Sequence, residues 1–249
     1  MKRIALITGG TGGIGFATAK QLGQEGYYII LNGIIEAQGT ACVSELQALD
    51  IESEFQLFDC TDEHAVNACI EAVGQRLGKI DVLINAAGGL GGRSRFENMP
   101  TAFYKSVMAL NLDSAFYVSR ACIPFLKKSE DASIINFASN AAYNAGGPGA
   151  GIYGTSKAAV MVLTRALAKD LAEFGIRVNA VSPGTIDTPF HQATKDNNPQ
   201  LFQSFANNIL MKRLGQPSEV ATVIAFLVSK NASFITGEIV QINGGQDLL

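Results

Sequence analysis

Short apolar runs alternate with longer segments of helical periodicity along the whole sequence of 249 residues, and no feature restricts the fold more. Strands that alternate with helices form a parallel sheet, because each crossover helix packs back onto a face of that sheet. We therefore predict a single α/β domain over residues 1–249, a doubly wound parallel sheet of about seven strands with helices on both faces. The expected strands are 4–8, 27–32, 54–58, 82–85, 133–138, 177–181 and 239–243. The clearest helices are 153–174 and 219–228.

The composition excludes several classes of protein. Charged residues interrupt every apolar stretch before ~18 residues, so no membrane span is expected, and the first apolar run is too short for a signal peptide. A net charge of −3 provides no basic stripe for nucleic acid. Four cysteines without CxxC spacing and only two histidines make a metal site unexpected. Free thiols of this kind indicate a reducing cytoplasm.

A glycine-rich segment, Thr8-Gly9-Gly10-Thr11-Gly12-Gly13-Ile14-Gly15, follows the first expected strand. Glycines let the backbone turn tightly and approach a pyrophosphate, which then rests on the N-terminus of the next helix. A plain tight turn is the alternative. Because the segment lies in the first βαβ unit, we interpret it as a dinucleotide site with contacts from Gly9, Thr11, Gly12, Gly13 and Ile14.

In folds of this kind, the residue just after the second strand contacts the adenosine ribose of the cofactor. A 2′-phosphate at this position needs an arginine or lysine, yet Gly33, Ile34 and Ile35 are all uncharged. The sequence therefore favours NAD(H) over NADP(H). With no acidic residue here, the amide of Asn32 is the candidate for the ribose hydroxyls.

Two more strand ends carry candidate cofactor contacts. Asp59, followed by Cys60, is either an acceptor for the adenine amino group or a turn or cap residue. The run Asn85-Ala86-Ala87-Gly88 has small side chains that let a cofactor lie close to the backbone, and Asn85 can tie neighbouring strands together. We place Asp59, Cys60, Asn85, Ala86 and Gly88 in the predicted cofactor site.

Three cationic or titratable residues are candidates for an anionic substrate. Arg93 and Arg95 follow a glycine-rich loop after the fourth strand, where a guanidinium grips a carboxylate bidentately. His191 lies in the least regular segment, 182–200, which is long enough to act as a lid. The alternative for all three is a solvated loop charge.

Four polar residues form the predicted catalytic group. Tyr153 and Lys157 are four apart and share one face of a helix. A phenol titrates near ~10, and an adjacent ammonium favours the phenolate, which makes proton exchange with a substrate oxygen practical. Ser139 ends a buried strand, where its hydroxyl would face the phenol. Asn111, in mid-helix, is either a polar link to the lysine through water or an ordinary irregularity.

In this order, the glycine segment, Asn85-Ala-Ala-Gly88, Asn111, Ser139, Tyr153-x-x-x-Lys157 and Pro183-Gly184 resemble the short-chain dehydrogenase/reductase family over essentially the whole chain. The resemblance implies a Rossmann fold that binds nicotinamide at the carboxyl ends of the strands, and a cytoplasmic homotetramer. Residues expected to line the nicotinamide are Pro183, Gly184, Ile186 and Thr188.

The resemblance also implies a role for each catalytic candidate. Tyr153 would be the acid/base, and Lys157 would bind the nicotinamide ribose and lower the tyrosine pKa. Ser139 would hydrogen-bond the substrate carbonyl or hydroxyl, and Asn111 would hold a water of the proton relay.

The substrate stays open between several classes. The segments 146–157 and 186–191 are similar to bacterial reductases that convert 4-deoxy-L-erythro-5-hexoseulose uronate to 2-keto-3-deoxygluconate. Leu31-Asn32-Gly33 is similar to NAD-linked 3-hydroxybutyrate dehydrogenases, and the general pattern suits 3-oxoacyl-carrier-protein reductases. A dinucleotide-sensing binding protein is the non-enzyme alternative. A sensor needs the glycine segment but not Tyr153, so an oxidoreductase acting on a carbonyl or alcohol is favoured.

Overall fold

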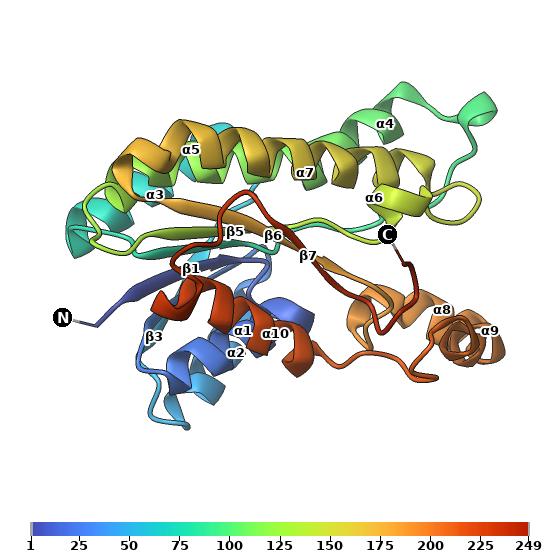
Figure 1. Cartoon of the computed structure of the whole chain (residues 1–249), viewed down its shortest axis with the longest axis horizontal. Helices are drawn as coiled ribbons and strands as arrows, with labels where there is room; N and C mark the ends of the chain where they lie inside the picture. The colour runs from blue at the N-terminus through green and yellow to red at the C-terminus, as the bar shows by residue number, and fades with distance from the viewer. Residues whose placement is uncertain (1, 249) are drawn as a thin grey trace.

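Seven parallel strands form one sheet between two helical layers in the computed structural model, which describes residues 2–248 (Figure 1). The spatial order is β3-β2-β1-β4-β5-β6-β7. Each expected strand is present with ends within two residues of its predicted limits, so the predicted fold class is confirmed. The strands are β1 (Ile4–Thr8), β2 (Tyr28–Gly33), β3 (Ser53–Leu57), β4 (Val82–Asn85), β5 (Ser133–Phe137), β6 (Arg177–Pro183) and β7 (Ile239–Ile242).

The long helices divide between the two faces of the sheet (Figure 1). One face is covered by α1 (Gly13–Gln24), α2 (Glu36–Gln47) and α10 (Pro217–Val228). The other is covered by α3 (Glu63–Leu77), α5 (Ser114–Leu126) and α7 (Gly151–Leu171).

Strand β1 shows why the strands read as continuous apolar runs. Successive side chains of a strand point to opposite faces. Ile4 and Leu6 therefore pack with α3, α5 and α7, whereas Ala5 and Ile7 pack with α1, α2 and α10. Both faces are buried, which removes the polar alternation of a half-exposed strand.

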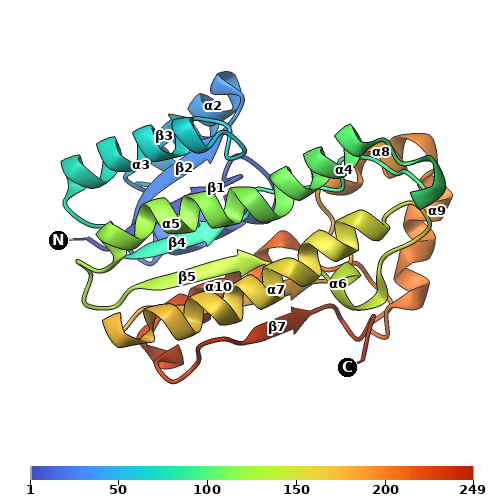
Figure 2. The same cartoon turned by 90° about the horizontal axis from the view of Figure 1, so that it is seen from above.

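The short helices gather at the end of the sheet toward which the strands point (Figure 2). They include α4 (Thr101–Met108), which continues into α5 through a π-helical turn at Ala109–Asp113, and α6 (Ala141–Asn144) after β5. The segment after β6 holds a 3₁₀ turn at Pro189–His191, α8 (Gln192–Asn197) and α9 (Pro199–Ser204).

The segment 182–200 is therefore more regular than the loop that its composition predicts. Asn198 caps α9 by accepting a hydrogen bond from the Leu201 backbone N–H, at 3.0 Å. Pro199 occupies the first helical position, where its missing N–H costs nothing. The same residue types that indicate a loop here begin a helix.

Candidate active site

The glycine segment between β1 and α1 fits the pyrophosphate of a dinucleotide. Gly12 is the N-cap of α1 and no side chain caps this helix, so its first N–H groups are free to bind an anion. A Cβ built on Gly12 meets no atom within 4 Å, whereas one on Gly9 would lie 2.9 Å from the Ala87 backbone. Gly9 also has a φ of 60°, which favours glycine. The segment is therefore unobstructed at Gly12, whereas Gly9 packs against the backbone that follows β4.

The far side of this opening is formed by the segment after β6. A Cβ on Gly13 would lie 3.5 Å from Cγ2 of Thr188, so Thr188 faces the glycine segment, and its nicotinamide contact stays a prediction. Gly184 lies so close to β7 that a Cβ would be 2.8 Å from Cα of Asn243. Ile186 is buried, and a Cβ on Gly215 would be 2.4 Å from its Cδ1, so its cofactor contact stays a prediction.

The amide of Asn32 is buried and already hydrogen-bonded within the protein. Its Nδ2 donates to the carbonyls of Gln56 and Phe58 at 3.2 and 2.9 Å. Its Oδ1 accepts from Cys60 Sγ at 3.1 Å. These bonds do not favour a ribose contact through the Asn32 amide, and the cofactor contacts of Asn32 and Cys60 stay predictions.

The surface next to Asn32 is apolar. Gly33 is buried against Thr11, because a Cβ on it would lie 2.8 Å from Cγ2 of Thr11. Ile34 and Ile35 follow with exposed fractions of 69% and 50%. The Oδ1 atom of Asp59 accepts from the N–H and hydroxyl of Thr61, both at 2.8 Å, so the turn interpretation of Asp59 is confirmed. Its adenine contact stays a prediction.

Asn85 ties strands together, as predicted, and its side chain points inward. Its Nδ2 donates to Oδ1 of Asn136 on β5 at 2.8 Å and to Oγ of Ser119 at 2.9 Å. The residues after Asn85 remain accessible to a cofactor through their backbone. Gly88 has no room for a side chain, since a Cβ would lie 2.9 Å from Oδ1 of Asn111 and 3.1 Å from Nζ of Lys157.

Tyr153 and Lys157 lie on the first turns of α7, as predicted. Lys157 is buried, and its Nζ donates to the Phe137 carbonyl at 2.8 Å and lies 5.8 Å from the ring centre of Tyr153. Burial lowers the pKa of Lys157 to about 8 and raises that of Tyr153 above its usual value. The expected lowering of the tyrosine pKa by Lys157 is therefore not seen, because burial disfavours both the ammonium and the phenolate.

Ser139 faces the phenol, as its position at the end of β5 predicts. The Ser139 hydroxyl favours the phenolate of Tyr153 and so acts against the larger effect of burial on the tyrosine pKa. The Oγ atom of Ser139 also accepts from the Ala141 N–H at 3.1 Å and donates to Oδ1 of Asn140 at 3.3 Å. The Ser139 hydroxyl and the Tyr153 phenol therefore lie close together, near the buried Lys157.

Asn111 lies in the π-helical turn between α4 and α5. Its Nδ2 donates to the carbonyls of Gly89 and Val107 at 2.9 and 3.0 Å, and its Oδ1 accepts from the Gly89 N–H at 3.0 Å. Turns of this kind are frequent at functional sites. Because the side chain already holds the loop after β4, a water bound here would use the remaining acceptor capacity of Oδ1.

The structure separates the two candidate arginines. Nη1 of Arg93 donates to the Pro148 carbonyl at 3.0 Å, and the neighbouring Ser94 N–H donates to the Gly149 carbonyl at 3.0 Å. These bonds join the loop after β4 to the loop before α7. Arg93 therefore has a structural partner that the sequence does not reveal.

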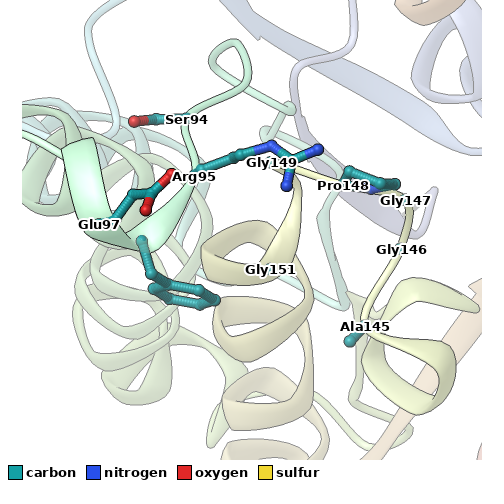
Figure 3. Close-up of a pocket in the computed structure, with 10 residues that line it drawn as sticks. Ser94, Arg95, Glu97, Ala145, Gly146, Gly147, Pro148, Gly149 and Gly151 are labelled. Atoms are coloured by element: carbon teal, nitrogen blue, oxygen red, sulfur yellow. The ribbon is translucent and has the colours of Figure 1, made fainter.

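Arg95 lines a surface pocket of about 580 Å³ between these two loops. Figure 3 shows its side chain reaching toward Gly149 and Pro148. Within residues 2–248 its guanidinium has no hydrogen-bond or ion-pair partner. The other lining residues are Ser94, Phe96, Glu97, Ala145, Gly146, Gly147, Pro148, Gly149 and Gly151.

His191 belongs to an aromatic cluster that the sequence analysis missed. Its ring centre lies 5.0 Å from that of Phe190, 5.8 Å from Phe202 and 5.9 Å from Phe205. Burial, together with the charge of nearby Lys195, lowers the pKa of His191. The lowered pKa favours the neutral imidazole, and a contact between His191 and an anionic substrate stays a prediction.

Phe190 connects this cluster to the candidate catalytic group, since its ring centre lies 6.0 Å from that of Tyr153. The only available signal in the sequence is three phenylalanines in a segment otherwise rich in polar residues and proline. They form an apolar wall beside the phenol.

The arrangement suits proton transfer at an oxygen next to a bound dinucleotide. Among residues 2–248, no group of three or more His, Cys, Asp or Glu side chains is placed to hold a metal ion. In the same part of the chain, no helix has the length and apolar character needed to cross a membrane.

Comparisons with known proteins agree with this geometry. The model of the family described as Enoyl-(Acyl carrier protein) reductase matches residues 9–247. The 3-oxoacyl-[acyl-carrier-protein] reductase FabG of Thermotoga maritima is 35% identical over 243 residues, which cover 98% of this chain and 97% of the relative. A cyclopentanol dehydrogenase of Comamonas testosteroni is 33% identical over 243 residues, 98% of this chain and 96% of its own.

A solved structure, that of the NADH-dependent reductase A1-R′ responsible for alginate metabolism, superposes with a TM-score of 0.90. It is 36% identical and covers 100% of this chain and 98% of its own.

Proposed function

Because the chain belongs to the short-chain dehydrogenase/reductase family and is an NAD(P)-dependent oxidoreductase, we propose that it reduces the carbonyl of a keto-sugar acid with NADH. A substrate of this class is 4-deoxy-L-erythro-5-hexoseulose uronate, whose product is 2-keto-3-deoxygluconate. The observation that carries the proposal is the interaction between Ser139 and Tyr153, with Nζ of the buried Lys157 5.8 Å from the ring centre of Tyr153.

In this proposal the protein residues handle the proton and the substrate oxygen, and bound nicotinamide supplies the hydride. Tyr153 donates its proton to the oxygen as charge develops there, because its raised pKa keeps the phenol protonated at neutral pH. The Ser139 hydroxyl hydrogen-bonds the same oxygen. In its charged form Lys157 stabilises the phenolate left on Tyr153.

The residues around the glycine segment would hold the cofactor. The free N–H groups of α1 bind its pyrophosphate, and Lys157 binds the nicotinamide ribose. Exposed Ile34 and Ile35 next to Gly33 provide no charge for a 2′-phosphate, which supports NAD over NADP.

The pocket that Arg95 lines, which reaches Gly151 at the start of the helix of Tyr153, supports a hydroxylated acid as substrate. Arg95 offers an unpartnered guanidinium to a carboxylate, and Glu97 offers acceptors to hydroxyl groups. A hydrocarbon chain gains nothing from either charge. The NADH-dependent reductase A1-R′ responsible for alginate metabolism, which is 36% identical, is a relative that supports this class of substrate.

A 3-oxoacyl-[acyl-carrier-protein] reductase is the second candidate. It is favoured by the relative of Thermotoga maritima and by the apolar wall that Phe190 forms beside Tyr153. A short acyl chain would pack on this wall. The two candidates therefore differ in the residue that would contact the substrate, Arg95 or Phe190.

The test is NADH oxidation with 4-deoxy-L-erythro-5-hexoseulose uronate, acetoacetyl-coenzyme A and an uncharged ketone. Arg95→Ala should lower kcat/KM for the uronate by roughly ten- to a hundredfold, because a charge-assisted hydrogen bond contributes about 1.5–3 kcal/mol. The uncharged ketone should be unaffected. Arg165→Ala, which removes an exposed arginine of α7, is the matched control. Equal turnover of the uronate by parent and Arg95→Ala would refute the sugar-acid assignment.

We also propose a cytoplasmic homotetramer. Apolar side chains stand exposed on the outer helices: Phe116 on α5, Val162 on α7 and Phe226 on α10, with exposed fractions of 40%, 64% and 45%. These residues lie on both faces of the molecule, which supports contacts with more than one neighbouring copy.

A further inference from the structure

The last residues of the chain return to the segment that carries Ser139. Strand β7 ends at the carboxyl edge of the sheet, and the residues after it pass next to α6 (Figure 1). The Asp247 carboxylate accepts from Nδ2 of Asn140 at 3.1 Å and from Nδ2 of Asn144 at 3.0 Å. Its backbone carbonyl accepts from Nδ2 of Asn243 at 2.8 Å. The tail is therefore held in place at the end of β5.

Gln246, the residue before Asp247, is hydrogen-bonded to the segment that follows β6. Oε1 of Gln246 accepts from the Thr185 N–H at 2.9 Å and from the Thr185 hydroxyl at 3.1 Å. Thr185 directly follows Pro183-Gly184, the segment expected to face the nicotinamide. Residues 246 and 247 thus join the segment after β5 to the segment after β6.

Asp247 also decides which end of the Asn140 amide faces Ser139. A carboxylate only accepts hydrogen bonds, so it binds the NH₂ end of the amide. The carbonyl end, Oδ1, is then turned to Ser139 and accepts from its Oγ at 3.3 Å. Among residues 2–248, Asp247 is the side chain that hydrogen-bonds the NH₂ end of this amide, so it distinguishes the two orientations.

The orientation matters because a serine hydroxyl has one proton and two lone pairs. The Ala141 N–H occupies one lone pair of Ser139. If the Asn140 amide were reversed, its NH₂ group would take the second lone pair, and the serine proton would lose its acceptor on this side. With the amide as observed, Oδ1 of Asn140 holds the serine proton, which can move to the oxygen of Tyr153 or of a substrate.

We propose that Asp247, acting through Asn140, is a positioning residue that orients the hydroxyl of Ser139 for catalysis. The inference rests on the proposed catalytic role of Ser139. It makes the C-terminal tail a part of the active site, although neither Asn140 nor Asp247 touches the reacting atoms.

The test is a double-mutant cycle with NADH oxidation and acetoacetyl-coenzyme A or the keto-uronate as substrate. Asp247→Asn should lower kcat by about tenfold, the effect of one misdirected hydrogen bond, with the KM for NADH unchanged. In a Ser139→Ala background the same substitution should have no further effect, because the group on which it acts is gone. Asn140→Ala should behave in the same way as Asp247→Asn in both backgrounds.

Asp170→Asn, at the exposed far end of α7, is the matched control and should keep the parent kcat. The inference is overturned if Asp247→Asn keeps the parent kcat, or lowers kcat by the same factor in both backgrounds, as a general loss of structure would. If Ser139→Ala alone keeps the parent kcat, the proposed role of Ser139 fails and the inference fails with it. Loss of activity in Ser139→Ala but not in Asp247→Asn overturns the role of the tail alone.

Discussion

Lys157 on α7 donates a hydrogen bond from Nζ to the Phe137 carbonyl on β5 at 2.8 Å, and both residues are buried. The ammonium is thereby fixed against one neutral acceptor in apolar surroundings. Burial lowers its pKa from 10.5 to about 8. Burial of the charged Lys157 therefore lowers the free energy of unfolding of the cofactor-free protein.

We predict that Lys157→Met stabilises the cofactor-free protein at pH 7 and that this advantage fades as the pH rises. The folded pKa of about 8 lies below the unfolded value of 10.5, so the unfolded chain binds this proton more tightly between these two values. The parent therefore gains stability through this window. The full difference corresponds to on the order of 3 kcal/mol.

Denaturant unfolding of both proteins at pH 7, 8, 9 and 10 checks this prediction. The difference in unfolding free energy between variant and parent isolates Lys157, because cysteines and other tyrosines titrate alike in both proteins. A difference that stays constant over this range would contradict the pKa assigned to Lys157.

Tyr153→Phe should reduce turnover by roughly 10²- to 10⁴-fold, the contribution of general acid–base catalysis. The ring keeps its packing against Phe190 and loses only the transferable proton, so NADH binding should persist. Steady-state kcat and fluorescence titration with NADH measure the two effects separately. Tyr104→Phe, at an exposed position on α4, is the matched control. Near-normal turnover in Tyr153→Phe would remove this residue from the acid/base role.

Ile34→Arg should shift the cofactor preference toward NADPH. Ile34 is exposed next to Gly33 and Thr11, where a guanidinium would meet the 2′-phosphate. The ratio of kcat/KM for NADPH to that for NADH should rise roughly ten- to a hundredfold. Ile34→Leu should leave the ratio near that of the parent. A parent enzyme that uses NADPH as well as NADH would show that the apolar surface at Ile34 does not select NAD.

Light scattering at micromolar concentration should give a mass close to four times the 26.3 kDa of one chain. Val162→Glu should lower the mass, because it introduces a charge at an exposed apolar position of α7. A parent that elutes as a monomer would contradict the tetramer.

The fold could be predicted from the sequence because burial on both faces leaves a signature at the five central strands, β1, β2, β4, β5 and β6. The same logic places Ser139, which ends an apolar run, and Tyr153 and Lys157, which share a helix face, at one edge of the sheet. These inferences need only local pattern and the rule that strands of a parallel sheet end together.

The remaining features depend on side-chain partners that no local pattern specifies. Asn32 sits at the predicted strand end, yet its amide turns inward to the carbonyls of Gln56 and Phe58. Asp247 and Asn140 are 107 residues apart, so their hydrogen bond has no periodicity to reveal it. Burial also changes the pKa of Tyr153 in the direction opposite to that expected from its neighbour Lys157.

The position of β7 at the edge of the sheet has a consequence for synthesis. A ribosome makes the chain from the N-terminus, so β1 to β6 can assemble before this strand exists. The Gly184 N–H binds the Ile242 carbonyl at 2.9 Å, and β6 has no neighbour on this side until β7 has been made. The segment after β6, which carries the predicted nicotinamide contacts, therefore lacks this support in the nascent protein. A tag fused after residue 249 would begin two residues beyond Asp247, which hydrogen-bonds Asn140 next to Ser139, whereas one placed before β1 would begin at the opposite end of the sheet.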